Sequence, residues 1–157
     1  MAAPRTSVDD VLEAVASSET ARLGLHLLTV AHGVEKILDE QMTAGGLSLA
    51  RWRILVQLND RVAIRQKALA DKLGHAERTV TQAVESLAAD GLVDRTADPA
   101  DRRAKLVVLT DEGAAALAAG TRTGTRVLQG LFGTLSERQR TELARLLNRL
   151  GDTMAER

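Results

Sequence analysis

Residues 66–89 read QKALADKLGHAERTVTQAVESLAA and contain two apolar patterns at helical spacing, with a glycine between them. The first pattern predicts a helix over about 66–73, and the second predicts a helix over about 77–89. Gly74 and His75 stand in the short turn between them. Two short helices joined by a tight turn that contains glycine are typical of a helix-turn-helix.

A β-hairpin is expected directly after this unit. Gly91 ends the second helix, and the apolar segments 92–93 and 106–109 are the strand candidates. They flank the polar segment 96–103, whose Asp-Pro pair at 98–99 favours a turn. A helix-turn-helix followed by a hairpin is a winged helix, and we call this hairpin the wing.

The chain before the helix-turn-helix indicates further helices. Ser7 and Asp10 have the spacing of a capping box, which predicts a short N-terminal helix. A longer helix of about five or six turns follows, carries an apolar stripe and ends at Gly-Gly 45–46. Ser48 is a good N-cap for another helix, which closes near residues 59–60.

Two amphipathic helices are expected after the wing, the first capped by Thr110 or Asp111 and the second by the capping box of Ser136 and Gln139. The apolar stripes of the terminal helices have no place in a small winged helix, and a second copy of the chain is the simplest partner for them. These stripes include Leu23, Leu27, Val34, Leu143, Leu147 and Leu150.

The predicted fold is therefore mainly α with a small β wing. It combines a winged helix-turn-helix at residues 47–110 with a helical dimerisation region formed by 1–46 and 111–157.

Composition excludes several classes of protein. The 157 residues are 45% hydrophobic and 27% charged, which is typical of a globular chain with a core of its own. Only 1% are aromatic and none is cysteine, so disulfides, iron–sulfur clusters and thiol chemistry are excluded. No apolar run is long enough for a membrane helix, and no signal peptide is apparent. We therefore expect a cytoplasmic protein without a membrane partner.

Four segments resemble the MarR (multiple-antibiotic-resistance regulator) family of bacterial transcription factors. Residues 47–55 (LSLARWRIL) are similar to its Leu-Thr-x-x-Gln-Trp-x-Val-Leu helix, and 68–74 (ALADKLG) to its Glu-Leu-Ala-x-x-Leu-Gly segment. Residues 79–95 resemble its recognition helix and the beginning of its wing. Residues 101–113 (DRRAKLVVLTDEG) match Asp-x-Arg-Ala-x-x-x-x-Leu-Thr-x-x-Gly, which is the most specific of the four. The resemblance implies a homodimer that binds a pseudo-palindromic operator in double-stranded DNA and regulates transcription, with repression expected.

The second helix of a helix-turn-helix enters the major groove with its N-terminal part. Arginine can pair there with phosphate or guanine, glutamine with adenine, and threonine with phosphate or a thymine methyl. Two positions depart from the family: Ala76 lacks the usual capping hydroxyl, and Gln82 stands where arginine is common. The expected contacts of this helix are Glu77, Arg78, Thr79, Thr81 and Gln82.

The resemblance also implies contacts by the wing. Arg103 would approach the minor groove, whose negative potential attracts arginine where it is narrow, while Asp101 helps to hold the tip. The role of Arg102 stays open. Charges of both signs nearly balance from Arg65 to Lys105, so a basic face must come from placement. Further candidate phosphate contacts are Lys67, Lys72, Arg95 and Lys105.

Family members often bind small aromatic acids between the helical region and the winged domain. The resemblance therefore implies a small aromatic or anionic effector, with His26, His32, Arg51, Trp52 and Arg53 as candidate ligand-binding residues. Trp52 also fits the core, and both histidines fit ordinary structural positions. The two histidines lie about 120° apart around their helix and cannot chelate one metal alone, so we expect no metal and no cofactor.

Enzymatic function is not expected. The sequence contains no glycine-rich phosphate loop, no Gly-x-Ser-x-Gly elbow and no His-Glu-x-x-His motif. Two alternatives to a regulator remain open, because a fold alone does not dictate a function. These are a winged-helix protein–protein adaptor and a chromatin binder of low sequence specificity.

Overall fold

The computed structural model describes residues 17–60, 62–101 and 104–156. They belong to two compact units that divide between Ile37 and Leu38. The expected N-terminal helix near Ser7 lies outside the described residues, as do Arg102 and Arg103 of the wing.

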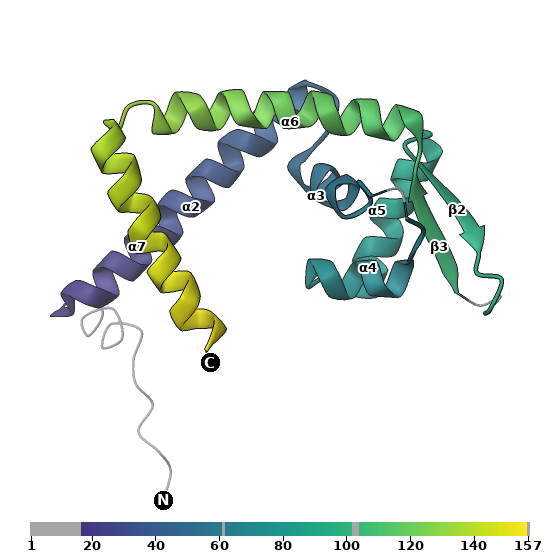
Figure 1. The fold of residues 1–157 in the computed structure, drawn as a ribbon, viewed down its shortest axis with the longest axis horizontal. Coiled ribbons are helices and arrows are strands. Elements are labelled where there is room, and N and C mark those ends of the chain that lie inside the picture. Colours follow the sequence, from purple (N-terminus) through teal and green to yellow (C-terminus); the bar gives the residue numbers. More distant parts are fainter. Residues whose placement is uncertain (1–16, 61, 102–103, 157) are drawn as a thin grey trace, which may run out of the picture. The chain divides into compact units, whose positions relative to one another are not determined.

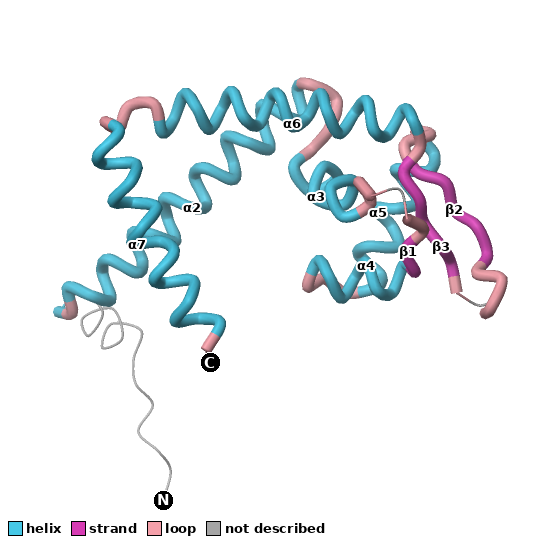
Figure 2. The backbone as a smooth tube through the Cα atoms, viewed as in Figure 1, coloured by secondary structure: helices cyan, strands magenta, loops and turns pink. Residues whose placement is uncertain are grey.

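The described chain is mainly helical with one small sheet, as predicted (Figure 1). Strands β1, β2 and β3 are coloured separately from the helices in Figure 2. In chain order the elements are α2 (Glu19–Ala44), α3 (Leu49–Gln57), β1 (Ile64–Arg65), α4 (Gln66–Leu73), α5 (Glu77–Ala89), β2 (Val93–Ala97), β3 (Lys105–Leu109), α6 (Asp111–Phe132) and α7 (Glu137–Ala155).

The predicted bounds of α4 and α5 are confirmed, while α2 is longer than expected. It spans 26 residues, about seven turns, because Glu19 to Arg22 continue the helix before the first residue of the apolar stripe. The hydroxyl of Ser18 accepts a hydrogen bond from the backbone N–H of Ala21 at this end (3.3 Å). A polar first turn therefore escaped a prediction made from apolar spacing alone.

The sheet corrects the expected wing in two ways. Its order is β1-β3-β2 with antiparallel pairs, and β1 was not expected because a strand of two residues has no periodicity of its own. Strand β2 also continues through Thr96 to Ala97, residues that the sequence placed in the turn, while Leu92 lies before the strand. Pairing with β3 over the whole of 93–97 holds these polar residues in the strand.

Side-chain caps begin three helices as the sequence predicts. Ser48, Thr110 and Ser136 each accept a hydrogen bond from a backbone N–H in the first turn of α3, α6 and α7. Ser136 forms a complete capping box with Gln139. A second oxygen supports α3, since Asp39 Oδ1 near the end of α2 accepts from the backbone N–H of Leu49 (2.9 Å).

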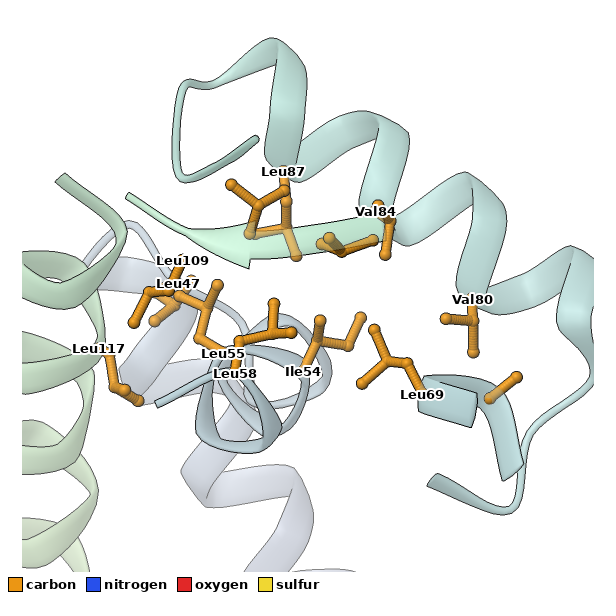
Figure 3. Packing of buried hydrophobic residues seen from close by; sticks show 13 residues of the cluster. Leu47, Ile54, Leu55, Leu58, Leu69, Val80, Val84, Leu87, Leu109 and Leu117 are labelled. Atoms are coloured by element: carbon orange, nitrogen blue, oxygen red, sulfur yellow. The ribbon is translucent and has the colours of Figure 1, made fainter. Parts of the chain in front are cut away.

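The hydrophobic core lies between α3, α4, α5, the sheet and the first half of α6. Figure 3 shows the side chains of Leu55, Leu69, Val84, Leu87 and their neighbours pointing toward one another from these elements. Each of these four is fully buried. The core fixes α5 by one face and leaves its opposite face to solvent.

The packing around Gly113 explains why the segment 101–113 ends in glycine. A Cβ on this residue would lie 1.9 Å from the backbone oxygen of Leu92, closer than any real contact. The Thr110 hydroxyl connects the same two segments. It donates to the oxygen of Gly91 (2.8 Å) and accepts from the N–H of Gly113 (2.9 Å). The start of α6 therefore packs directly on the backbone that enters β2.

Candidate nucleic-acid interface

The N-terminal half of α5 presents a polar face. Val80, Val84 and Leu87 bury the opposite face of this helix, which leaves Arg78 and Gln82 directed away from the core. Glu77, Arg78, Thr79 and Gln82 are all exposed. This is the face that a recognition helix offers to the major groove.

The start of α5 has no side-chain cap, as the alanine at position 76 leads one to expect. Its first-turn N–H groups are therefore without a side-chain acceptor, and they favour a nearby anion such as a phosphate. Glu77 stands in the same turn and lies 3.8 Å from the ammonium group of Lys67. Both groups are largely exposed, so this ion pair is weak and a phosphate can compete for Lys67.

A groove of about 270 Å³ lies between α4, α5 and the wing. It brings together five of the residues expected to contact DNA, which come from three separate segments of the chain. These residues are Lys67, Glu77, Thr81, Asp101 and Lys105.

Thr81 and Arg95 have partners within the protein. The Thr81 hydroxyl donates to the backbone oxygen of Glu77 (2.8 Å) and accepts from Gln66 Nε2 (2.5 Å). Arg95 donates to Glu85 Oε1 (3.3 Å) and to Gln66 Oε1 (3.4 Å). Any contact of these two residues with DNA must compete with these bonds. Gln66, for which the sequence predicts no role, joins α5 to strand β2 through its amide group.

The wing tip is organised around Asp98. Its carboxylate accepts hydrogen bonds from the backbone N–H of Ala100 (2.8 Å) and from Arg65 Nε (2.7 Å). Asp101 contributes through its backbone, since its N–H donates to the oxygen of Asp98 (3.2 Å) and its oxygen accepts from Ala104 (2.8 Å). The side chain of Lys105 is exposed beside this turn.

These contacts lower the pKa of Asp98 below its ordinary value of 3.8. The N–H of Ala100 is the largest cause, burial of the carboxyl opposes it, and Arg65 adds to the lowering. A carboxyl whose pKa is lower in the folded state stabilises the fold above its unfolded pKa, and that contribution is lost as pH falls through the folded pKa.

We therefore expect Asp98 to hold the wing unchanged between pH 5 and pH 8, and to release it only below its ordinary pKa. A carboxyl-carbon NMR titration measures this, with an expected midpoint below 3.8. Arg65 and the neighbouring Asp101 face the same turn, so the titration should be repeated in Arg65→Gln, where the midpoint should rise. A midpoint at or above the ordinary value in the wild type would contradict the expectation.

The candidate ligand-binding residues fall in both compact units. His26 and His32 are exposed on α2 in the first unit. In the second unit, Arg51 pairs with Asp90 at the end of α5 (2.5 Å), and Trp52 Nε1 donates to Thr121 Oγ1 (3.0 Å). Trp52 is half-buried against the core, and Arg53 is exposed.

An apolar groove of about 550 Å³ lies beside Trp52, between α3 and α6. Val56 and Leu117 contribute apolar surface, and Arg122 stands at the same groove. Arg122 was not expected at this groove from the sequence, because it belongs to a helix that was expected only to serve dimerisation. None of the carboxylates that the structure describes pairs with Arg122.

Within 17–60, 62–101 and 104–156, no cluster of three or more metal-ligating side chains occurs. None of the described helices is long and apolar enough to cross a membrane.

Several known proteins are similar to this chain in both sequence and fold. Residues 47–105 match the model of the MarR family. The HTH-type transcriptional regulator YdgJ of Bacillus subtilis (strain 168) is 28% identical over 125 residues, which cover 79% of this chain and 76% of that protein.

Two solved structures from Escherichia coli have the same fold. Wild-type MarR in its apo form matches with a TM-score of 0.73 and 25% identity, over 82% of this chain and 95% of that one. A mutant MarR complexed with operator DNA matches with a TM-score of 0.71 and 25% identity, over 84% and 95%. The family model thus matches the winged helix-turn-helix at residues 47–105 as a MarR-family domain, and over most of its length the chain is similar in sequence and fold to transcriptional regulators, MarR among them.

Proposed function

We propose that the chain is a homodimeric, sequence-specific repressor whose DNA binding is relieved by a small aromatic or anionic molecule. The observation that carries the proposal is the exposed N-terminal face of α5, with the groove to α4 and the wing beside it. This face offers a bidentate hydrogen-bonding amide and a guanidinium side by side. We also propose that the protein acts in the cytoplasm, where such a regulator meets DNA.

The two recognition helices of a symmetric dimer enter successive major grooves. The operator is then a pseudo-palindrome whose half-sites lie about one helical turn apart. Arg78 and Gln82 are the side chains that read bases, and Thr79 is placed for a phosphate or a thymine methyl. Lys67, Lys105, Arg102 and Arg103 supply phosphate or minor-groove contacts.

Gln82→Ala should lose about 1–3 kcal/mol of operator binding and relax the preference at one base pair in each half-site, because the bidentate adenine contact is gone. Binding to a panel of duplexes with single base-pair changes, ranked by fluorescence anisotropy, measures this. Ser86→Ala, exposed on the later part of α5, is the matched control and should leave the ranking unchanged. Equal weakening on all duplexes would show that Gln82 does not read a base.

Dimerisation is supported by apolar side chains that this chain leaves uncovered. Helix α7 has 19 residues and buries none of them, although Leu146, Leu147, Leu150 and Met154 form an apolar face. On α2, Leu23 and Leu28 are 68% and 67% exposed. Faces of this kind mark interaction surfaces, and we assign them to the dimer interface. We also propose that residues 1–46 and 111–157 form the dimerisation region and that residues 47–110 form the winged helix-turn-helix.

The groove beside Trp52 is the proposed effector site. Trp52 supplies an aromatic wall, and Arg122 can pair with a carboxylate. Arg122 is better placed for this than Arg51, whose guanidinium already pairs with Asp90. An effector relieves DNA binding only if it prefers a dimer whose recognition helices no longer match successive grooves.

A panel of aromatic carboxylates titrated into the protein–operator complex should therefore include one that weakens binding by about 5- to 150-fold, the usual range of such coupling. Arg122→Gln should lower the response to that compound without changing operator affinity. Arg126→Gln, one turn further along α6 and outside the lining of the groove, is the control. Release by mild peroxide but by no carboxylate would refute the proposal, because a chain without cysteine has no thiol switch.

A wild-type protein that binds no duplex DNA at any salt concentration would refute regulation by DNA binding and favour a protein–protein adaptor. Binding that does not discriminate between sequences would favour a chromatin binder instead.

A further inference from the structure

Of all the charged and polar residues that the structure describes, Asp98 is the one that is buried. Burial of a carboxylate is unfavourable unless the group is paired and hydrogen-bonded, and both conditions are met here. Oδ1 accepts from Ala100, Oδ2 accepts from Arg65, and the backbone N–H of Asp98 donates to Ala104 (3.1 Å). The carboxylate thus closes the wing turn with one oxygen and reaches outside the wing with the other.

The position of Arg65 gives this outward bond its meaning. Arg65 is the last residue of β1 and also the residue before the first turn of α4. In the sheet it stands opposite Leu106 of β3, and Thr96 of β2 stands opposite Leu106 on the other side. Arg65 therefore reaches across the central strand to a residue just beyond the end of β2.

The next residue continues the connection on the other side. Gln66, the first residue of α4, donates to the hydroxyl of Thr81 on α5 and accepts from Arg95 on β2. Two consecutive side chains at the β1–α4 junction thus contact the wing and the recognition helix. The β1–α4 junction therefore links the wing to α5 through side-chain hydrogen bonds.

We propose that Arg65 and Asp98 are positioning residues for DNA binding, whose ion pair holds the wing tip at the distance from α5 that lets both elements contact one duplex. The inference rests on the proposed DNA binding. Neither side chain needs to contact DNA for it. The wing and α5 meet different grooves, so an error in their separation weakens binding on every sequence.

A purely electrostatic role and a positioning role of Asp98 predict opposite changes in DNA affinity for the substitution Asp98→Asn. Asp98→Asn removes a negative charge next to the DNA-facing surface, so electrostatics alone predicts tighter binding. The amide oxygen of the new side chain can still accept from Ala100, while the ion pair with Arg65 is lost. If the ion pair positions the wing, Asp98→Asn must weaken binding despite the gain in charge.

The experiment uses full-length protein and a duplex operator selected from random-sequence DNA with the wild type. Affinities of the wild type, Arg65→Gln, Asp98→Asn and the double variant are measured by anisotropy at several salt concentrations. Glu142→Gln and Arg145→Gln break an exposed ion pair on α7 (2.6 Å) and are the matched charge controls.

We expect Asp98→Asn to weaken operator binding by about tenfold and to lower the salt slope by about one to two, because wing phosphate contacts are lost. A variant that is only less stable has a smaller active fraction but the same slope. Amide hydrogen exchange at position 98 and at Ala104 should become faster in this variant. The α7 controls should bind like the wild type.

The double variant tests whether Arg65 acts through Asp98. If it does, Arg65→Gln has no further effect in the Asp98→Asn background. Independent losses that add would instead assign Arg65 to a direct DNA contact and overturn the inference. Asp98→Asn that binds as tightly as the wild type, or more tightly, overturns it as well. A wild type that binds no duplex overturns the proposed function itself.

Discussion

Replacing Leu147 and Leu150 together by glutamate should convert the protein to monomers and remove operator binding at physiological salt. Both side chains lie on the apolar face of α7 and are 43% and 51% exposed in the isolated chain. Two charges on each copy make burial of this face unfavourable. A monomer loses the effective concentration that links two half-sites, so its affinity should fall by about 10²- to 10⁴-fold.

Sedimentation equilibrium at micromolar concentration measures the first effect, and anisotropy with the operator measures the second. Asn148→Glu places one glutamate on the opposite, polar side of the same helix and should leave both unchanged. A wild type that sediments as a folded monomer, or a Leu147→Glu, Leu150→Glu variant that remains dimeric, would contradict the assignment of α7 to the dimer.

Gly113→Ala should cause the largest loss of stability from a single methyl group. The new Cβ would stand 1.9 Å from the Leu92 oxygen and 2.7 Å from Leu109 Cδ1, and the first of these contacts is to backbone. The start of α6 must then move, which also strains the cap that Thr110 makes to the N–H of residue 113. Overpacking of this kind costs about 1–3 kcal/mol, and a lost cap adds about 1 kcal/mol.

Urea unfolding at fixed protein concentration measures the free energy of unfolding of this variant. Gly130→Ala in the same helix is the matched control, because a Cβ there meets nothing within 4 Å. It should be neutral or more stable by up to about 1 kcal/mol, since alanine favours helix. Equal stability of Gly113→Ala and the wild type would mean that the α6 start yields easily.

The helices could be predicted from the sequence where periodicity and caps agree. The apolar spacing of Val80, Val84 and Leu87 fixes both the extent of α5 and the face that it buries. Ser48 and Ser136 mark the starts of α3 and α7 by a chemistry that depends on neighbouring residues only. The resemblance to a known family then gave the polar face of α5 its expected role.

The contacts that hold the wing could not be predicted in this way. An aspartate before a proline is ordinary for an exposed turn, and no local pattern distinguishes it from the buried Asp98. Its partner Arg65 stands 33 positions earlier and depends on a strand of two residues. Arg51 was assigned to a ligand on chemistry alone, while its partner Asp90 is set by packing. Such pairs are determined by tertiary structure.

The internal pairs of Arg51, Arg65 and Arg95 with acidic residues also bear on how the protein searches a genome. These three guanidinium groups are already paired inside the molecule, which lowers the positive charge that is free to attract arbitrary duplex. Binding to random DNA rests on contacts between phosphates and the cations that are not paired in this way. We therefore expect brief encounters and short sliding runs. Occupancy of the operator must then come from contacts with bases and from the fit of two half-sites. When the protein is released from the operator, little of it therefore stays bound to other sites on the chromosome.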